Sequence, residues 1–348
     1  DDGGLFVGFG GLPLKNAQIN QGGTGGHVQK GFVAKAHRAG VEFINISPLA
    51  ADMPDTVKSD WLAIRPNTDT ALMLGLCYTL LDEGLQDSDF LDRYCTGFDV
   101  FATYLHGTED GCTKSADWAA AICGLPADDI RNLARRMAGT RTMISLSWSL
   151  TRQAHGEQPM WAGIVLAAML GQIGLPGGGI GIGYSAVNRV GYDLNRVSFA
   201  SVPQGINAVK EFIPVARIAD MLLQPGSPFD YNGGCYSYPD IQLIYWAGGN
   251  PFHHHQDLTR LIQAWQKPQT VISHEWCWNA LARHSDIVLP VTTPVERRDI
   301  AMTPLDPYLV SMEPAIEPVG QARDDYDIFT ALSELMGVED AFTEGRTS

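Results

Sequence analysis

Residues 243–257 read LIYWAGGNPFHHHQD, and this stretch decides the fold that the sequence predicts. An apolar, β-prone segment at residues 242–247 runs into Gly248, Gly249 and Asn250, and a helical pattern follows at residues 257–265. A strand, a glycine-rich turn and a helix start place backbone N–H groups and the positive end of a helix against an anion such as a phosphate. The sequence therefore predicts an α/β fold with a ligand site at this turn.

The same alternation of strands and helices extends along the chain. We expect strands at residues 5–9, 41–46, 61–64, 141–148, 242–247, 270–273 and 286–289. Helical patterns occupy residues 70–84, 88–104, 115–123, 126–137, 158–173, 218–223, 258–265, 279–284 and 325–336. Repeated βα units with short apolar strands are typical of parallel sheets that helices cover on both faces. Such sheets bind ligands at the carboxyl ends of their strands.

Composition narrows the class of protein. The 348 residues are 45% hydrophobic and 18% charged, as expected for a folded chain of two or three domains. A net charge of −15 argues against a general nucleic-acid surface, and no apolar run is long enough to span a bilayer. The six cysteines fit no zinc or iron–sulfur spacing. The chain starts without Met just before a predicted strand, so we expect an internal fragment of a longer protein.

Three consecutive histidines, His253, His254 and His255, make the first turn chemically unusual. They cannot all point one way, and they lack the i, i+4 spacing of helix-borne zinc ligands, so we expect no metal ligand among them. An Asn-Pro turn with solvated histidines stays open as an interpretation. A nucleotide or polyanion site fits better, because the turn supplies N–H donors.

Two further strand ends carry polar groups. The segment 147–158, SWSLTRQAHGEQ, offers Trp148 for stacking and Arg152 for a phosphate, although a polar loop with a buried Trp explains it equally well. Glu275 ends the strand after the first turn and could hold a sugar hydroxyl or a guanine edge, or be a solvated carboxylate. No GxSxG elbow and no HExxH motif occurs, so no catalytic residue is predicted.

Several motifs occur together in one order along nearly the whole chain. They are Trp148-Ser149 with Arg152, residues 155–158 (HGEQ), 169–179 (MLGQIGLPGGG), 213–217 (IPVAR), 249–251 (GNP), 254–257 (HHQD), 282–290 (ARHSDIVLP), 296–297 (ER) and 325–329 (DYDIF). In this combination the chain resembles the molybdopterin oxidoreductases of the dimethyl sulfoxide reductase family. Within that family it resembles the S- and N-oxide reductases, and biotin sulfoxide reductase-like proteins most.

The resemblance implies a bis-molybdopterin guanine dinucleotide cofactor that holds one molybdenum. It also implies two doubly wound, mostly parallel-sheet domains. Residues 1–185 would contact one dinucleotide, and residues 186–348 would form the later part of the domain that contacts the other. The C-terminal barrel domain of the family would be absent from this chain, and the molybdenum ligand would lie upstream of it.

Nine residues match positions that the family uses for cofactor binding. They are Ser47, Pro66, Asp69, Trp148, Arg152, Asn250, His254, Glu275 and Asp325. The resemblance assigns the pterin or its phosphates to Trp148 and Arg152, and one guanosine end to Ser47, Pro66 and Asp69. The other four would serve the second dinucleotide. Many relatives carry Asp at the position of Ser47, so we expect guanine recognition there to be weaker or shifted to Asp69.

The function that this resemblance implies is reduction of an S-oxide or N-oxide. Biotin sulfoxide, dimethyl sulfoxide and trimethylamine N-oxide are substrates of the expected type, and the electron donor is unidentified. A formate- or nitrate-type molybdopterin oxidoreductase and a non-catalytic structural subunit stay open as alternatives, as do a cytoplasmic and a periplasmic location. We expect the fragment alone to be inactive.

Overall fold

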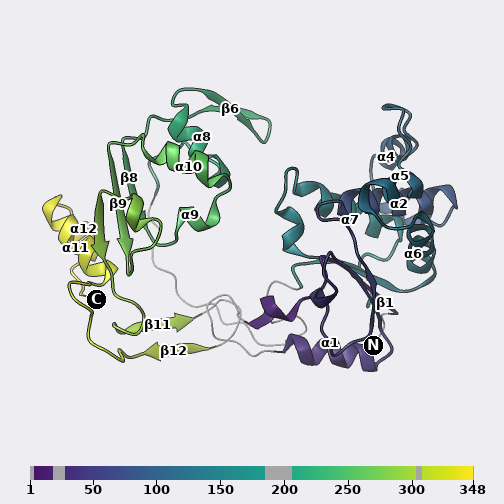
Figure 1. Cartoon of the computed structure of the whole chain (residues 1–348), viewed down its shortest axis with the longest axis horizontal. Coiled ribbons are helices and arrows are strands. Elements are labelled where there is room, and N and C mark those ends of the chain that lie inside the picture. The colour runs from purple at the N-terminus through teal and green to yellow at the C-terminus, as the bar shows by residue number, and fades with distance from the viewer. Residues whose placement is uncertain (1–3, 19–27, 185–205, 303–307, 348) are drawn as a thin grey trace. The chain divides into compact units, whose positions relative to one another are not determined.

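The computed structural model describes residues 4–18, 28–184, 206–302 and 308–347 and divides into two compact units (Figure 1). Unit 1 comprises Asp1–Ser198 and Met302–Tyr308, and unit 2 comprises Phe199–Ala301 and Leu309–Ser348. Each unit contains a parallel sheet with helices against it, which confirms the predicted α/β class. The domain boundary expected between residues 185 and 186 lies outside the described residues and stays a prediction.

Unit 1 is built on a five-stranded sheet in the order β3-β2-β1-β4-β5, with every neighbouring pair parallel. Its strands are β1 (Leu5–Phe9), β2 (Glu42–Ile46), β3 (Ser59–Leu62), β4 (Thr142–Leu146) and β5 (Gly179–Ile182). β3 starts and ends two residues earlier than the strand expected at residues 61–64. β5 was not predicted, because two of its four residues are glycines and the segment lacks the apolar alternation of a strand.

Helices cover both faces of this sheet, as in doubly wound folds. Leu5, Val7 and Phe9 share a buried cluster with residues of α2 (Asp69–Asp82), α5 (Ala116–Cys123), α6 (Ala127–Gly139) and α7 (Glu157–Met169). On the opposite face, Phe6 and Phe43 pack in a second cluster with Val33 of α1 (Gln29–Arg38). The split between faces follows from the alternation of side chains along a strand.

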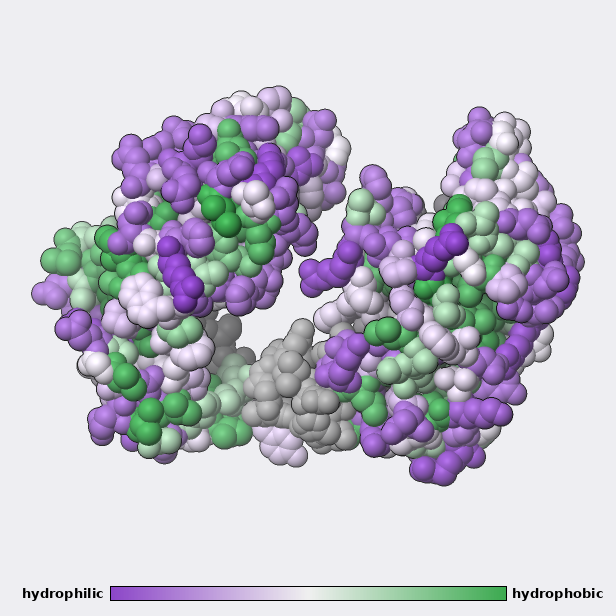
Figure 2. Space-filling model, in the orientation of Figure 1, coloured by the Kyte–Doolittle hydropathy of each residue, from purple (hydrophilic) through white to green (hydrophobic). Residues whose placement is uncertain are grey.

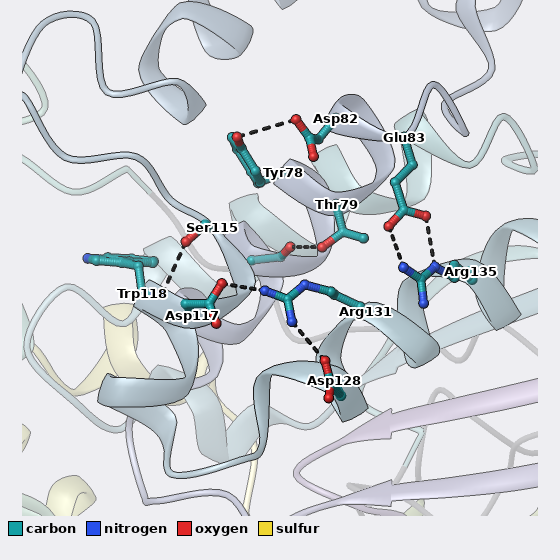
Figure 3. Close-up of polar contacts among 11 residues, drawn as sticks. Tyr78, Thr79, Asp82, Glu83, Ser115, Asp117, Trp118, Asp128, Arg131 and Arg135 are labelled. Atoms are coloured by element: carbon teal, nitrogen blue, oxygen red, sulfur yellow. Dashed lines mark hydrogen bonds and ion pairs between the residues drawn. The ribbon is translucent and has the colours of Figure 1, made fainter.

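Ion pairs join the outer helices of unit 1 (Figure 3). Arg135 on α6 makes a bidentate pair with Glu83, with nitrogen–oxygen distances of 2.8 and 2.7 Å, just after the end of α2. Arg131 joins Asp128 at 2.9 Å and also contacts Asp117 on α5. These pairs are largely exposed and screened by solvent, so they contribute little to stability. Two further helices, α3 (Ser88–Tyr94) and α4 (Phe98–Leu105), complete this side.

Unit 2 contains a three-stranded parallel sheet in the order β10-β9-β8. The strands are β8 (Leu243–Ala247), β9 (Thr270–Glu275) and β10 (Ile287–Pro290). On one face, Ile244 and Trp246 pack against the core that α8 (Ile218–Leu223) and α10 (Leu258–Trp265) build. On the other face, Tyr245 lies 5.8 Å, between ring centroids, from Phe329 of α11 (Asp325–Leu335).

Some elements of unit 2 differ from the prediction. The helix after the glycine turn begins at Pro251 as α9 (Pro251–His254), before the one expected from residue 257, because Asn250 caps it. The helix expected at 279–284 is a short 3₁₀ turn, Ala282–His284. The hairpin β6 (Pro228–Tyr231) and β7 (Gly234–Ser237), the ribbon β11 (Asp299–Met302) and β12 (Leu309–Met312), and α12 (Glu339–Thr343) were not predicted.

Apolar side chains lie at the surface over α11 and α12 (Figure 2). Leu335 and Met336 are 86% and 68% exposed.

Among the described residues, no helix is both long enough and apolar enough to cross a membrane.

The contact between α2 and α5 gives a test of the unit 1 core. A Cβ at Gly75 would lie 2.7 Å from the Cβ of Ala119, so we expect Gly75→Ala to lower the free energy of unfolding by about 1–3 kcal/mol. Gly139→Ala is the matched control, because a Cβ there meets nothing within 4 Å and Ala favours a helix by up to about 1 kcal/mol. Urea unfolding followed by circular dichroism measures both. Equal effects of the two substitutions would show that this contact is not tightly packed.

Candidate functional site

A cavity of about 340 Å³ opens at the carboxyl edge of the sheet in unit 2. Its walls come from the ends of β8, β9 and β10 and from the start of α11. The lining residues are Gly248, Gly249, Asn250, His254, His274, Glu275, Trp276, Asn279, Val291 and Asp325. The structure therefore brings the four candidate residues of this unit, Asn250, His254, Glu275 and Asp325, into one place.

The glycine turn lines the cavity. Gly248 and Gly249 have φ values of +88° and +75°, a backbone region that residues with a Cβ rarely adopt. A Cβ on Gly248 would meet nothing within 4 Å, so the space in front of this turn is open. Asn250 then caps α9, with its Oδ1 accepting from the backbone N–H of Phe252 at 3.0 Å.

Two buried polar groups in the cavity lack partners among the described residues. The side-chain oxygen of Asn250 accepts a hydrogen bond, but its amide nitrogen Nδ2 has no acceptor. Asn250 is only 9% exposed. The Oε1 atom of Glu275 has no donor, and this residue is 7% exposed. Such unpaired buried groups cost about 1–3 kcal/mol each. A ligand that presents both an acceptor and a donor would satisfy both groups.

Only one of the three histidines lines the cavity. His254 does so, whereas His253 and His255 are outside the lining. Burial and the neighbouring His254 lower the pKa of His255, which favours its neutral form. Among the described residues, no group of three or more His, Cys, Asp or Glu side chains is arranged to hold a metal ion.

Asp325 reaches the cavity because the chain before α11 pairs with the end of β10. The backbone N–H of Arg323 donates to the Pro290 carbonyl at 3.1 Å, and that of Thr292 donates to the Arg323 carbonyl at 3.1 Å. The hydroxyl of Thr292 also donates to Asp324 at 2.6 Å. Asp325 is thereby held beside His274, with 2.6 Å between its Oδ1 and the imidazole Nδ1.

The other five candidate residues lie along the carboxyl edge of the unit 1 sheet. Ser47 follows β2, Pro66 and Asp69 follow β3, and Trp148 and Arg152 follow β4. Parallel strands end at one edge, so these positions share a side of the sheet. Among the described residues, however, no hydrogen bond or ion pair joins any two of the five. Their role in cofactor binding stays a prediction.

The hydroxyl of Ser47 is already engaged. It donates to Oδ2 of Asp52 at 2.6 Å, and the other oxygen of Asp52 pairs with Lys15 at 2.8 Å. The indole N–H of Trp61 donates to the Ser47 carbonyl at 2.8 Å. A carboxylate therefore does stand beside Ser47, supplied by Asp52 five residues further along the chain.

Sequence reasoning missed Asp52 and also missed His274 and Asn279, which line the unit 2 cavity. His274 stands directly before the candidate Glu275, so its place at a strand end was a usable signal. Asp52 ends the 3₁₀ turn Ala50–Asp52, six residues after β2, and belongs to no motif that the sequence analysis singled out.

Asp69 is a buried carboxyl without a cationic partner among the described residues. It starts α2 and is 4% exposed, while the nearby Arg65 donates to the carbonyls of Ala121 and Ile122. Burial raises the pKa of Asp69 from 3.8 to about 6, and its own backbone N–H offsets this only in part. The folded chain therefore favours the protonated carboxyl.

This raised pKa predicts a pH-dependent stability. Because the folded-state pKa is above the unfolded one, the stabilising contribution is complete below pH 3.8 and is lost as pH rises through about 6. The loss amounts to about 3 kcal/mol. In cofactor-free protein, Asp69→Asn should therefore gain stability relative to the parent between pH 4 and pH 7, measured by urea unfolding. Asp129→Asn, at an exposed position in the first turn of α6, is the control and should show no such trend.

Comparison with known proteins places the chain in a family. Residues 4–335 match the family described as Molybdopterin oxidoreductase. The chain is 49% identical to biotin sulfoxide reductase of Cereibacter sphaeroides, over 98% of this chain and 46% of that protein. It is 42% identical to dimethyl sulfoxide/trimethylamine N-oxide reductase of Rhodobacter capsulatus (96% and 42%) and 43% identical to trimethylamine-N-oxide reductase of Haemophilus influenzae (92% and 40%).

Among solved structures, acetylene hydratase from Pelobacter acetylenicus matches with a TM-score of 0.58 and 19% identity, over 98% of this chain and 48% of that one. A likeness at this identity shows the fold alone. The chain spans less than half the length of the relatives named above. The family match covers both units and both candidate edges, and we conclude that the chain belongs to the molybdopterin oxidoreductase family.

Proposed function

We propose that this chain is part of a molybdenum-dependent reductase of S-oxides or N-oxides. Relatives that are 42–49% identical over at least 92% of the chain are named for the reduction of biotin sulfoxide, dimethyl sulfoxide or trimethylamine N-oxide. These names favour oxide reduction over formate or nitrate chemistry. The proposal concerns the whole protein, since the relatives are more than twice as long as this chain.

The family implies molybdenum and a molybdopterin, and we propose the bis-guanine-dinucleotide form. The observation that carries this is the pair of buried, unpaired groups in the unit 2 cavity, the Asn250 amide and the Glu275 carboxylate. A nucleoside offers both an acceptor for the amide and hydroxyl or N–H donors for the carboxylate. Retention of this donor and acceptor also argues against a non-catalytic structural subunit.

Unit 1 would hold the second dinucleotide at its carboxyl edge. Trp148 is 48% exposed, so its indole face is accessible for stacking. Arg152 is exposed after the 3₁₀ turn Trp148–Thr151 and could bind a phosphate bidentately. At the other end of the edge, a guanine N–H donor would favour the ionised form of Asp69 and lower its pKa again.

When bound, the metal supplies the redox chemistry, in which an oxide, two electrons and two protons give the reduced product and water. The residues of this chain bind and orient the nucleotide ends of the cofactor. None of the nine candidates is assigned a proton-transfer step, and the electron donor is unidentified.

The central test is the composition and activity of the purified holoprotein. Expressed in a host that makes the cofactor, it should contain molybdenum, with guanine in molar excess as a bis-dinucleotide requires. With a reduced viologen dye as artificial electron donor, it should reduce at least one of biotin sulfoxide, dimethyl sulfoxide and trimethylamine N-oxide. Folded protein that lacks molybdenum, or loaded protein that reduces none of the three, would overturn the proposal.

The Asn250 amide provides a residue-level test. Asn250→Asp keeps the oxygen that caps α9 but removes the unpaired donor and adds a charge beside Glu275. We expect a loss of about 10- to 100-fold in cofactor affinity, measured as guanine and molybdenum retained per polypeptide after gel filtration. Asn132→Asp on α6 is the control. The side-chain oxygen of Asn132 accepts a hydrogen bond from Arg135, and the substitution keeps this oxygen. Unchanged cofactor content in Asn250→Asp would remove this cavity from the site.

A further inference from the structure

A chain of hydrogen bonds lies directly behind the unit 2 cavity. The hydroxyl of Tyr245 on β8 is 2.7 Å from Nε2 of His274 on β9. The other imidazole nitrogen, Nδ1, is 2.6 Å from Oδ1 of Asp325 at the start of α11. Three elements therefore meet at one imidazole, and both of its nitrogens are occupied.

The imidazole has a single position in this environment. His274 is 4% exposed, and the ring of Phe329 stacks on it with 5.1 Å between centroids and 28° between planes. Phe329 and Asp325 are four residues apart on α11, so one face of the helix provides both the stacking ring and the carboxylate. Packing and two hydrogen bonds together fix the rotamer of His274.

Asp325 is in a different situation, because its side chain is 50% exposed and lines the cavity. A half-exposed aspartate can change rotamer unless another group holds it. Here the buried imidazole holds one oxygen, Oδ1. The second oxygen, Oδ2, has no hydrogen-bond partner within the described part of the chain and is available to a ligand.

The protonation pattern follows from Tyr245. Burial and the nearby Asp325 carboxylate raise the pKa of this phenol, so its hydroxyl stays protonated and can donate to Nε2. With Tyr245 donating to Nε2, the Nδ1 atom of His274 is the donor to Asp325. Every donor in the chain finds an acceptor, and the direction of donation runs from Tyr245 toward the cavity.

We propose that His274 is a positioning residue, which together with Tyr245 fixes the Asp325 carboxylate toward the N–H or hydroxyl donors of the nucleotide that the cavity binds. This inference rests on the proposed function of the cavity. A carboxylate that is already oriented loses little conformational freedom on binding, which raises affinity without a new contact. His274 acts through Asp325 and is assigned no step in the reaction.

Two substitutions of His274 test its hydrogen bonds to Tyr245 and to Asp325 separately. The amide nitrogen of His274→Asn falls near the position of Nδ1 and can still donate to Asp325. That of His274→Gln falls near Nε2 and contacts only Tyr245. In the purified holoprotein, we expect His274→Gln and Asp325→Asn each to reduce retained guanine and molybdenum about tenfold. His274→Asn should restore retention to within about threefold of the parent, and the His274→Gln/Asp325→Asn double variant should lose no more than either single variant.

The matched control is Asp327→Asn, which removes an equal charge from the same turn of α11 at an exposed position that does not line the cavity. It should retain the cofactor fully. If His274→Gln folds poorly, as judged by its thermal midpoint, Tyr245→Phe takes its place, because removing one hydroxyl should still reduce retention about threefold.

The outcomes distinguish the two proposals. Equal loss of cofactor in His274→Asn and His274→Gln, in step with their thermal midpoints, would show that His274 only packs, and would overturn the inference. Full retention in His274→Gln or Tyr245→Phe, together with loss in Asp325→Asn and Asn250→Asp, would overturn the inference and leave the cavity's function intact. Full retention in Asp325→Asn and Asn250→Asp would instead reject the cavity as the cofactor site.

Discussion

Parallel pairing of neighbouring strands is the constraint on which the candidate sites depend. Because β8, β9 and β10 run in one direction, Gly249, Glu275 and Val291 arrive at the same edge although they are distant in sequence. The five-stranded sheet of unit 1 does the same for the segments that follow β2, β3 and β4. The sheets therefore position the polar turns, and the side chains on and after these turns form the candidate sites.

Buried polar groups without partners lower the stability of the ligand-free fold. The Asn250 amide and Glu275 Oε1 are buried without partners among the described residues, and burial also opposes ionisation of Asp69 at neutral pH. Each of these features favours a bound state that supplies the missing partner. In the proposed site, folding and cofactor binding would therefore be coupled through the same side chains.

The sequence predicts well the strands that depend on a local apolar pattern. β1 and β8 are apolar runs that end at glycines, and both lie where the pattern indicates. β5 was not predicted because its glycines break the alternation of apolar and polar residues that indicates a strand. Its pairing with β4 determines its structure. The His274–Asp325 contact joins residues 51 positions apart, and the Ser47–Asp52 contact depends on how the chain turns after β2, so neither has a local signature.

The backbone pairing of Arg323 with the end of β10 isolates Asp325 from changes upstream. Residues 313–322, between β12 and this pairing, include no helix or strand. Insertions or deletions at Gly320 and Gln321, after the hydrogen bonds of this segment to Val295 and Glu296, would alter a surface loop and leave the start of α11 in register with the sheet. Homologues could therefore vary in length at this connection while the carboxylate beside His274 keeps its place.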